Sequence, residues 1–218
     1  FRLKDSSNAY MPKKLGGITY GVHLGQVYTD YSTGSFKVTD NTTDFAIDGN
    51  GFFAIAFTDK QGNTSVKYTR DGSFTVNTEG YLVTKDGDYV LNATGAMNGD
   101  PSRNNFIQVD PNATVTVNKM GYVIQNDQVV GTLGVVDVDN YDYLEKYGEN
   151  MYNLLDGGNR IATDAKVEQG VLETSNVNVV NEMVNMITIQ RAYEANQKVI
   201  TSIDSTLDRA VNNVGRVQ

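Results

Sequence analysis

The sequence predicts a mainly β protein with one long C-terminal α-helix, in which a body of short antiparallel strands and hairpins sits on a helical stem. Two observations lead to this prediction. The first 170 residues hold 20 of the 21 glycines and all three prolines. The last 48 residues hold only Gly215 and no proline, so nothing before that glycine interrupts a helix. We expect an extended lead-in over residues 1–43, the body over 44–170 and the helix over 171–218.

The lead-in is polar and rich in glycine and tyrosine, and its only extended segment is expected between Ile18 and Tyr31. Residues 1–5 contain neither an initiator methionine nor the apolar stretch of a cleaved signal peptide, so we expect a trimmed chain. His23 is the only histidine, and cysteine is absent. We therefore predict neither a zinc site nor a Ser-His-Asp triad.

From Asp44 onward, short apolar runs alternate with tight-turn signals. The segment 48–51 (Asp-Gly-Asn-Gly) separates the first two runs, and acidic-glycine pairs recur after it. Such pairs supply the positive backbone dihedrals that hairpin turns require. Strands are predicted at 45–47, 52–57, 66–68, 74–76, 81–83, 89–91, 106–109, 114–117, 122–124, 128–130 and 133–136. Residues 141–170 are polar and predict an irregular connection to the helix.

The C-terminal region predicts one uninterrupted helix from Asn176 to Val214, roughly 58 Å long at 1.5 Å per residue. Its apolar positions follow alternating steps of three and four residues, the pattern of a helix that lies along another helix. This seam consists of Met186, Ile189, Tyr193, Asn196, Ile200, Ile203, Leu207, Ala210 and Val214. Upstream it shifts to Val180, Met183, Val184 and Ile187, which predicts a stripe that is wide near the start of the helix.

A helix of this length needs a partner, because packing of its apolar face usually stabilises it more than its intrinsic propensity does. Folding back on its own domain is the ordinary outcome, but no second long helix is evident in the sequence. We therefore expect the helix to pack on other molecules, with Asn196 fixing register. The predicted interface residues are Leu172, Val177, Val180, Met183, Ile187, Tyr193, Asn196, Ile200, Ile203 and Leu207. Leu172 and Val177 are expected to fix the junction between body and stem.

The net charge of −8 lies in the body, where residues 41–170 carry nine basic and 18 acidic groups. Residues 171–218 carry four basic and five acidic groups, so the helix can approach copies of itself without strong repulsion. No basic stripe is present, which argues against nucleic-acid binding. No run of eighteen apolar residues occurs, so membrane insertion is not predicted. We predict no cofactor, no metal, no small-molecule substrate and no enzymatic activity.

Four motifs resemble those of a known family. Residues 44–53 (DFAIDGNGFF), 68–74 (YTRDGSF), 172–180 (LETSNVNVV) and 190–196 (QRAYEAN) are similar to bacterial flagellar basal-body rod and hook proteins of the FlgG/FlgF type. The resemblance covers nearly all of residues 16–217. The N-terminal helix with which members of the family normally begin has no counterpart in this sequence.

The resemblance implies a structural subunit that polymerises through its terminal helix, both with itself and with other rod and hook subunits. It implies a place in the flagellar basal body, in the periplasm, after export without a cleaved signal peptide. It also implies that the N-terminal helix of the family is the antiparallel partner of the C-terminal one.

Two other classes of protein stay open on the residues alone. A secreted β-rich adhesin or fibre module with a helical stalk has similar composition, and glycan binding by the isolated body would identify it. A hydrolase with paired carboxylates is also open, because 26 acidic residues are available and the required spacing is spatial rather than sequential.

Overall fold

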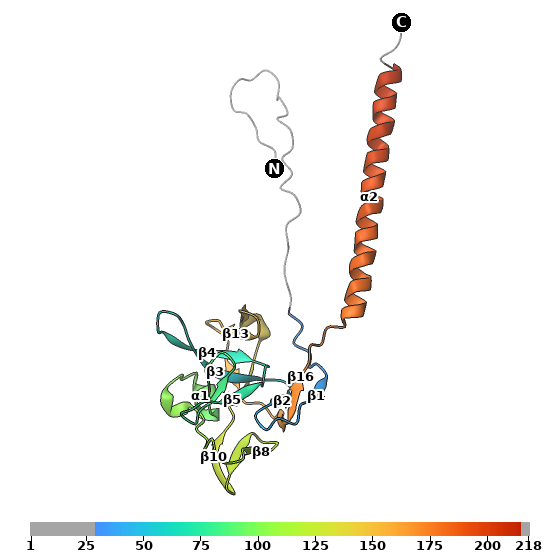
Figure 1. Ribbon diagram of the computed structural model, residues 1–218. Helices are drawn as coiled ribbons and strands as arrows, with labels where there is room; N and C mark the ends of the chain where they lie inside the picture. Colours follow the sequence, from blue (N-terminus) through green and yellow to red (C-terminus); the bar gives the residue numbers. More distant parts are fainter. Residues whose placement is uncertain (1–28, 215–218) are drawn as a thin grey trace, which may run out of the picture. The chain divides into compact units, whose positions relative to one another are not determined.

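The computed structural model describes residues 29–214, and it shows a body of short antiparallel strands followed by one long helix (Figure 1). This confirms the predicted fold class. The chain divides into two units, Phe1–Ser32 and Thr33–Gln218, and nearly all described residues belong to the second. His23 and most of the expected lead-in lie outside the described residues.

The largest sheet is built around one long strand, β3 (Phe52–Thr58). Its strand order is β12-β13-β4-β3-β7-β6-β5, and β11 joins it by pairing with β3 and with β14. All of these pairs are antiparallel. The other strands of the sheet are β4 (Thr64–Thr69), β5 (Phe74–Val76), β6 (Leu82–Thr84), β7 (Tyr89–Val90), β11 (Val135–Val138), β12 (Leu144–Tyr147), β13 (Met151–Leu154) and β14 (Arg160–Ile161).

Three smaller sheets complete the body. One contains β8 (Thr116–Val117), β9 (Tyr122–Gln125) and β10 (Gln128–Thr132); a second pairs β2 (Phe45–Asp48) with β15 (Lys166–Gln169); the third pairs β1 (Phe36–Val38) with β16 (Val171–Glu173). The short helices are α1 (Ala93–Asn98), η1 (Arg103–Asn105) and η2 (Tyr141–Tyr143). We call the β1–β16 pair the neck, because β16 is the last strand before the long helix.

The core joins these sheets through aromatic side chains that are far apart in the sequence. Phe45, Phe53 and Phe74 are essentially inaccessible to solvent. The ring of Phe74 lies 5.3 Å from that of Phe53, edge to face, and 6.1 Å from that of Phe45. Such edge-to-face pairs add to the free energy of burial. The body therefore has a well-packed core of its own.

The turn at residues 48–51 does not close a hairpin, contrary to the prediction. Gly49 and Gly51 do have positive φ angles, 126° and 139°. However, β2 pairs with β15, and β3 pairs with β4, β7 and β11. The turn redirects the chain from one sheet to another, because the best partner for β2 comes from residues more than a hundred positions later.

Other predicted hairpins are confirmed. β5 pairs with β6, β6 with β7, and β9 with β10. The β9–β10 turn has two non-glycine residues with positive φ, Asn126 at 51° and Asp127 at 61°, as in the type I′ turns that suit hairpins.

Two further predictions for the body are wrong, and one element was missed. Residues 141–170 contain four strands rather than an irregular connection. Residues 106–109 form only isolated bridges, Leu91 with Phe106 and Tyr81 with Gln108. Helix α1 was not predicted, because six residues are too few for a helical period to be recognised. Its bounds come from the Asn92 side chain, which accepts a hydrogen bond from the Gly95 N–H, and from the left-handed Gly99.

The long helix α2 spans Val179–Val214. It begins three residues later than the predicted Asn176, and residues 171–173, which the predicted boundary at 171 placed with the helix, pair with β1 as strand β16. The Asn178 carboxamide accepts hydrogen bonds from the N–H groups of Val180 and Asn181, at 3.1 and 3.2 Å, and so caps the first turn. The helix continues to Val214, the last residue that the structure describes. Within residues 29–214, no helix combines the length and apolarity needed to cross a bilayer.

Candidate subunit interface

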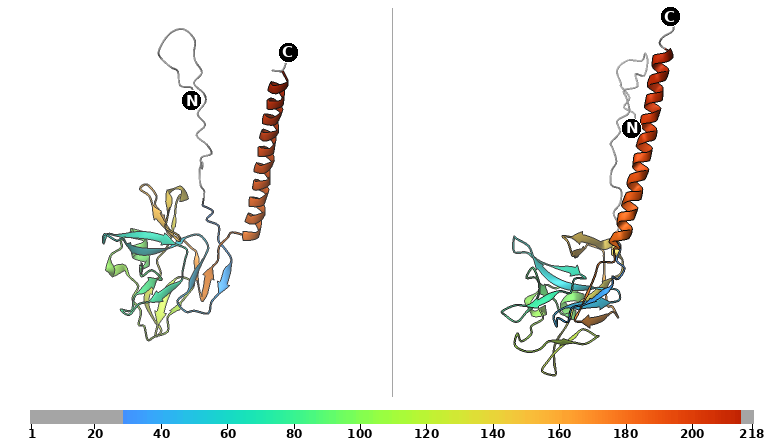
Figure 2. Two further views of the ribbon diagram at one scale, coloured as in Figure 1. Left: turned by 45° about the horizontal axis from the view of Figure 1, so that its top comes forward. Right: turned by 45° about the vertical axis from the view of Figure 1, so that its right-hand side comes forward.

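Helix α2 leaves its apolar side chains uncovered. Every residue from 174 to 212 is exposed, and the helix runs without a break in all views (Figures 1 and 2). Contiguous apolar surface of this extent is rare on a soluble monomer and marks interaction sites. The large apolar side chains involved are Val179, Val180, Met183, Val184, Met186, Ile187, Ile189, Tyr193, Val199, Ile200, Ile203, Leu207 and Val211.

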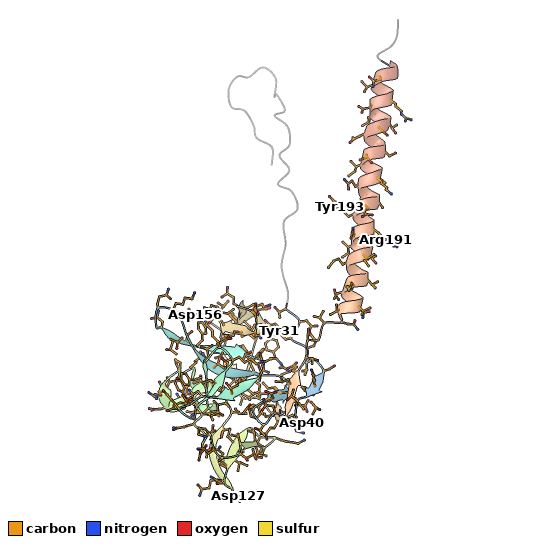
Figure 3. All side chains as sticks on the ribbon, viewed as in Figure 1. Tyr31, Asp40, Asp127, Asp156, Arg191 and Tyr193 are labelled. Atoms are coloured by element: carbon orange, nitrogen blue, oxygen red, sulfur yellow. The ribbon has the colours of Figure 1, made fainter. Side chains whose placement is uncertain are left out.

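The side chains in the first turns spread over more of the helix surface than those further along. Val180, Met183, Val184 and Ile187 lie on the side opposite to Ile189 and the later residues of the seam. Ile187 and Ile189 are two residues apart, so at about 100° per residue they point to nearly opposite sides. Figure 3 shows the same relation for Arg191 and Tyr193. Val179 and Met186 are also exposed and lie between these two groups, as expected for a stripe that is wide near the start of the helix.

The predicted interface residues lie in three different settings. Leu172 is half-buried in β16, opposite Lys37 of β1. Val177 is 55 % exposed in the segment before the helix. All the other predicted residues are exposed on α2, including Asn196 on the seam. Their role as an interface stays a prediction. The side chain of Val214 lies outside the described residues.

A charged cluster ties the neck to the body. Arg70 Nε lies 2.9 Å from Glu173 Oε2, and the two side chains are only 16 % and 11 % exposed. The same guanidinium donates to the carbonyl oxygen of Gly51 at 2.8 Å and to that of Gly49 at 3.1 and 3.2 Å. Glu173 Oε1 also accepts from the Gly34 N–H at 2.7 Å. The pair thus joins β1, β16 and the 48–51 turn.

The neck is closely packed next to this cluster. The N–H and hydroxyl of Thr174 both donate to the Ser35 carbonyl oxygen at 2.8 Å. A Cβ atom on Gly34 would lie 1.8 Å from the Thr174 carbonyl oxygen, so only glycine fits there. Sequence reasoning did not assign the Arg70–Glu173 pair. The available signal was that both residues lie in motifs shared with flagellar rod and hook proteins.

The polar chemistry of the body is structural in character. Tyr68 is fully buried, which raises the pKa of its hydroxyl, while the hydrogen bond and charge of Arg160 oppose this shift. Burial also lowers the pKa of Lys67, against the charge of Glu145. Lys67 Nζ donates to Asn153 Oδ1 at 2.8 Å and lies 4.4 Å from the centre of the Tyr147 ring. Each of these buried polar groups has a partner.

The acidic side chains show no arrangement that implies chemistry. An open polar depression includes Glu79, Asp110 and the amide of Gln125. That amide is engaged, because it accepts from the Asp110 N–H and donates to the carbonyl oxygens of Asp110 and Ala113. Asp88 has a raised pKa, chiefly through burial and also through the charge of Asp86. In the described part of the chain, no three His, Cys, Asp or Glu side chains are grouped to hold a metal ion.

Comparison with known proteins gives consistent matches. The family model "Flagellar hook protein FlgE/F/G D1 domain" matches residues 46–125, and "Flagellar basal body rod FlgEFG protein C-terminal" matches residues 168–213. The chain is 37 % identical to the flagellar basal-body rod protein FlgF of Caulobacter vibrioides over 193 residues, which cover 88 % of this chain and 73 % of the relative. It is 33 % identical to the rod protein FlgG of Bacillus subtilis over 203 residues, which cover 89 % and 74 %.

Proposed function

The chain belongs to the family of flagellar basal-body rod proteins and is a structural subunit of the rod; from this premise we propose that it polymerises through α2. The partners are further copies of the chain and other axial proteins of the rod and hook. Assembly takes place in the periplasm, after export without a cleaved signal peptide. The chain carries out no catalysis.

The observation that carries the proposal is the exposure of α2. Burial of one large apolar side chain stabilises a structure by about 1.5–3 kcal/mol. Covering several seam residues therefore supplies enough free energy to hold subunits together. Asn196 at the centre of the seam restricts the register, because a buried amide must find a partner.

The neck gives the helix a defined connection to the body. The Arg70–Glu173 pair and the two Thr174 hydrogen bonds join the last strand before α2 to distant parts of the chain. A load on the helix passes through the exposed segment 175–178 and is then carried into the β body through these several bonds. In this proposal the bodies form the outer shell of the rod and stiffen it against torque.

The rival functions differ in their support. The comparisons give no support to an adhesin or fibre module. The only acidic side chains that could be cited for a paired-carboxylate hydrolase are those described above. Turnover in a substrate screen that one Asp→Asn change abolished would be required to revive it.

The test places charge on the seam. The double variant Ile200→Asp/Leu207→Asp should be lost from purified basal bodies, because two carboxylates cannot be buried in an apolar contact. The matched control is Thr201→Asp/Ser205→Asp, which adds the same charge on the polar side of the same turns and should be incorporated normally. Equal incorporation of both variants would contradict polymerisation through the seam. Circular dichroism of the purified chains checks that both variants remain helical.

A further inference from the structure

We propose that Asn50 is a site of spontaneous modification, at which its carboxamide reacts with the backbone nitrogen of Gly51 and is converted to aspartate and isoaspartate. The reaction needs no enzyme, metal or cofactor, because water is the only co-reactant. The inference is independent of the proposed function. It concerns the 48–51 turn, whose carbonyl oxygens accept hydrogen bonds from Arg70 beside the neck.

Two asparagines of the chain are followed by glycine, Asn50 and Asn98. The reaction is fastest in this dipeptide, since glycine has no side chain to hinder the approach of its nitrogen. Both asparagines are exposed. Neither carboxamide makes a hydrogen bond with the residues that the structure describes, so both can turn toward the backbone. Sequence and exposure are therefore alike at the two sites, and only the fold distinguishes them.

The first difference is the state of the attacking nitrogen. The Gly99 N–H donates to the carbonyl oxygen of Gly95 at the end of α1. This bond must break before the nitrogen can attack, so the fold protects Asn98. The Gly51 N–H has no hydrogen-bond partner within residues 29–214, so its nitrogen is available to Asn50.

The second difference is a hydroxyl group that activates the reacting peptide. Thr163 Oγ1 donates to the Asn50 carbonyl oxygen at 2.6 Å and accepts from the Ala165 N–H at 3.1 Å, which fixes its direction. When the Gly51 nitrogen loses its proton, the negative charge spreads onto this carbonyl oxygen. A donor that is already aimed at the atom where charge develops stabilises that charge. Thr163 therefore favours the nucleophilic form of the Gly51 nitrogen.

The reaction has two steps. In the first, solvent base removes the Gly51 N–H proton, the nitrogen bonds to Cγ of Asn50, and the bond from Cγ to Nδ2 breaks, so that Nδ2 takes up a proton and leaves as ammonia. The product is a succinimide ring. In the second step, water adds to one of the two ring carbonyl carbons. Opening at Cγ gives aspartate, and opening at the backbone carbonyl carbon gives isoaspartate, in which the main chain runs through Cβ and Cγ.

The isoaspartate product alters the support of the neck, because it adds one methylene to the backbone of the turn. Arg70 donates to the carbonyl oxygens of both Gly49 and Gly51. Gly51 is also closely packed, since an added Cβ would lie 3.2 Å from the Val136 carbonyl oxygen. A longer backbone cannot keep both contacts with Arg70 in this space. Modification therefore loosens the link between the turn and the Arg70–Glu173 pair.

The test follows both asparagines in the purified full chain, incubated in neutral buffer with and without urea. Peptide mapping by mass spectrometry measures the replacement of NH2 by OH, and enzymatic methylation measures isoaspartate. In the folded chain we expect the Asn50 peptide to convert several-fold faster than the Asn98 peptide. In urea, where neither glycine nitrogen is held in a hydrogen bond, the two rates should become similar.

Two variants test the part played by the hydroxyl. Thr163→Val removes the hydroxyl with little change of shape, and it should slow conversion at Asn50 several-fold while the Asn98 rate stays unchanged. Thr163→Ser keeps the hydroxyl and should restore the faster rate. The Asn98 rate in each variant also reports whether the body remains folded, because unfolding raises it to the value in urea.

Conversion at Asn98 that equals or exceeds conversion at Asn50 in the folded chain would overturn the inference. So would an Asn50 that stays intact in the folded chain while it converts in urea. An unchanged Asn50 rate in Thr163→Val would overturn the role of the hydroxyl. The comparison of the two asparagines needs no variant, so it decides the inference even if Thr163→Val fails to fold.

Discussion

The body and α2 handle apolar side chains in opposite ways. In the body, Phe45, Phe53 and Ile47 are wholly inaccessible to solvent. In α2, the least exposed of the large apolar side chains described above is Ile187, at 48 %. The body buries its large apolar side chains against one another, whereas α2 exposes its own to solvent. From this difference we expect the body to be stable by itself, and we propose that α2 depends on contacts with other molecules.

The body and α2 also differ in net charge. The acidic groups are concentrated in the body, while the helical region is nearly neutral. Acidic bodies repel one another over a distance of about 8–10 Å at physiological salt, and neutral helices do not. We therefore expect contacts between subunits to form along the helices. The neck must then stay intact when force acts on the helix.

The largest expected effect comes from creating a cavity in the core of the body. Phe53→Ala should lower the free energy of unfolding by about 3–5 kcal/mol, because it removes a buried ring and leaves a cavity. Ile203→Ala on the exposed seam should change it by less than about 1 kcal/mol in the unassembled full chain. Urea denaturation followed by circular dichroism measures both. Similar losses of unfolding free energy in the two variants would contradict the difference between a buried body core and an exposed seam.

An intermediate effect is expected at the neck. Glu173→Gln should destabilise the body by about 2 kcal/mol, because the largely buried Arg70 loses its countercharge. The control is Glu79→Gln, which removes the partner of Arg103 in an ion pair with side chains 71 % and 58 % exposed. Its effect should stay below about 1 kcal/mol. Equal effects in thermal or urea unfolding would show that the neck contributes no more than an exposed ion pair.

The smallest effect is a dependence on alkaline pH that belongs to the body. Burial raises the pKa of Tyr68 above the ordinary value of about 10, so the unfolded chain loses this proton first. The stabilising contribution is complete below pH about 10 and is lost as the pH rises toward the folded pKa, at no more than about 1.4 kcal/mol per pH unit.

Tyr68→Phe removes this ionisation, so its free energy of unfolding should fall less steeply above pH about 10 than that of the natural sequence. The measurement is the urea midpoint of both chains across this range. The lost hydrogen bond with Arg160 adds an offset that is the same at every pH below the ionisation range. Parallel pH profiles would show that the Tyr68 hydroxyl does not titrate differently in the folded body.

The sequence was sufficient where the controlling interactions are local. The absence of glycine and proline predicted one long unbroken helix, α2, and alternating apolar runs predicted β2, β3 and β4. Positive φ angles were expected at the acidic-glycine pairs and are present at Gly49, Gly80 and Gly87, whereas Gly72 does not have one. These features depend on neighbouring residues, so a linear pattern contains them.

The predicted interface was only partly specified by the sequence. The seam follows from spacing alone, but the exposure of its side chains is known only from the structure. The Arg70–Glu173 pair was missed, because the two motifs mark each residue separately and do not pair positions that are 103 residues apart. Leu172 was placed in the helix and lies in a strand, since pairing with β1 competes successfully with helix formation there.

By itself, the sequence determined that this protein has a β body and a long helix with an apolar seam. Tertiary structure alone decided which strands pair, including β2 with β15, β4 with β13 and β1 with β16. The physical reason is how far along the sequence each kind of interaction reaches. Turn conformation and helical period are set within a few residues, whereas strand pairing is chosen by the joint burial of side chains that the sequence keeps far apart.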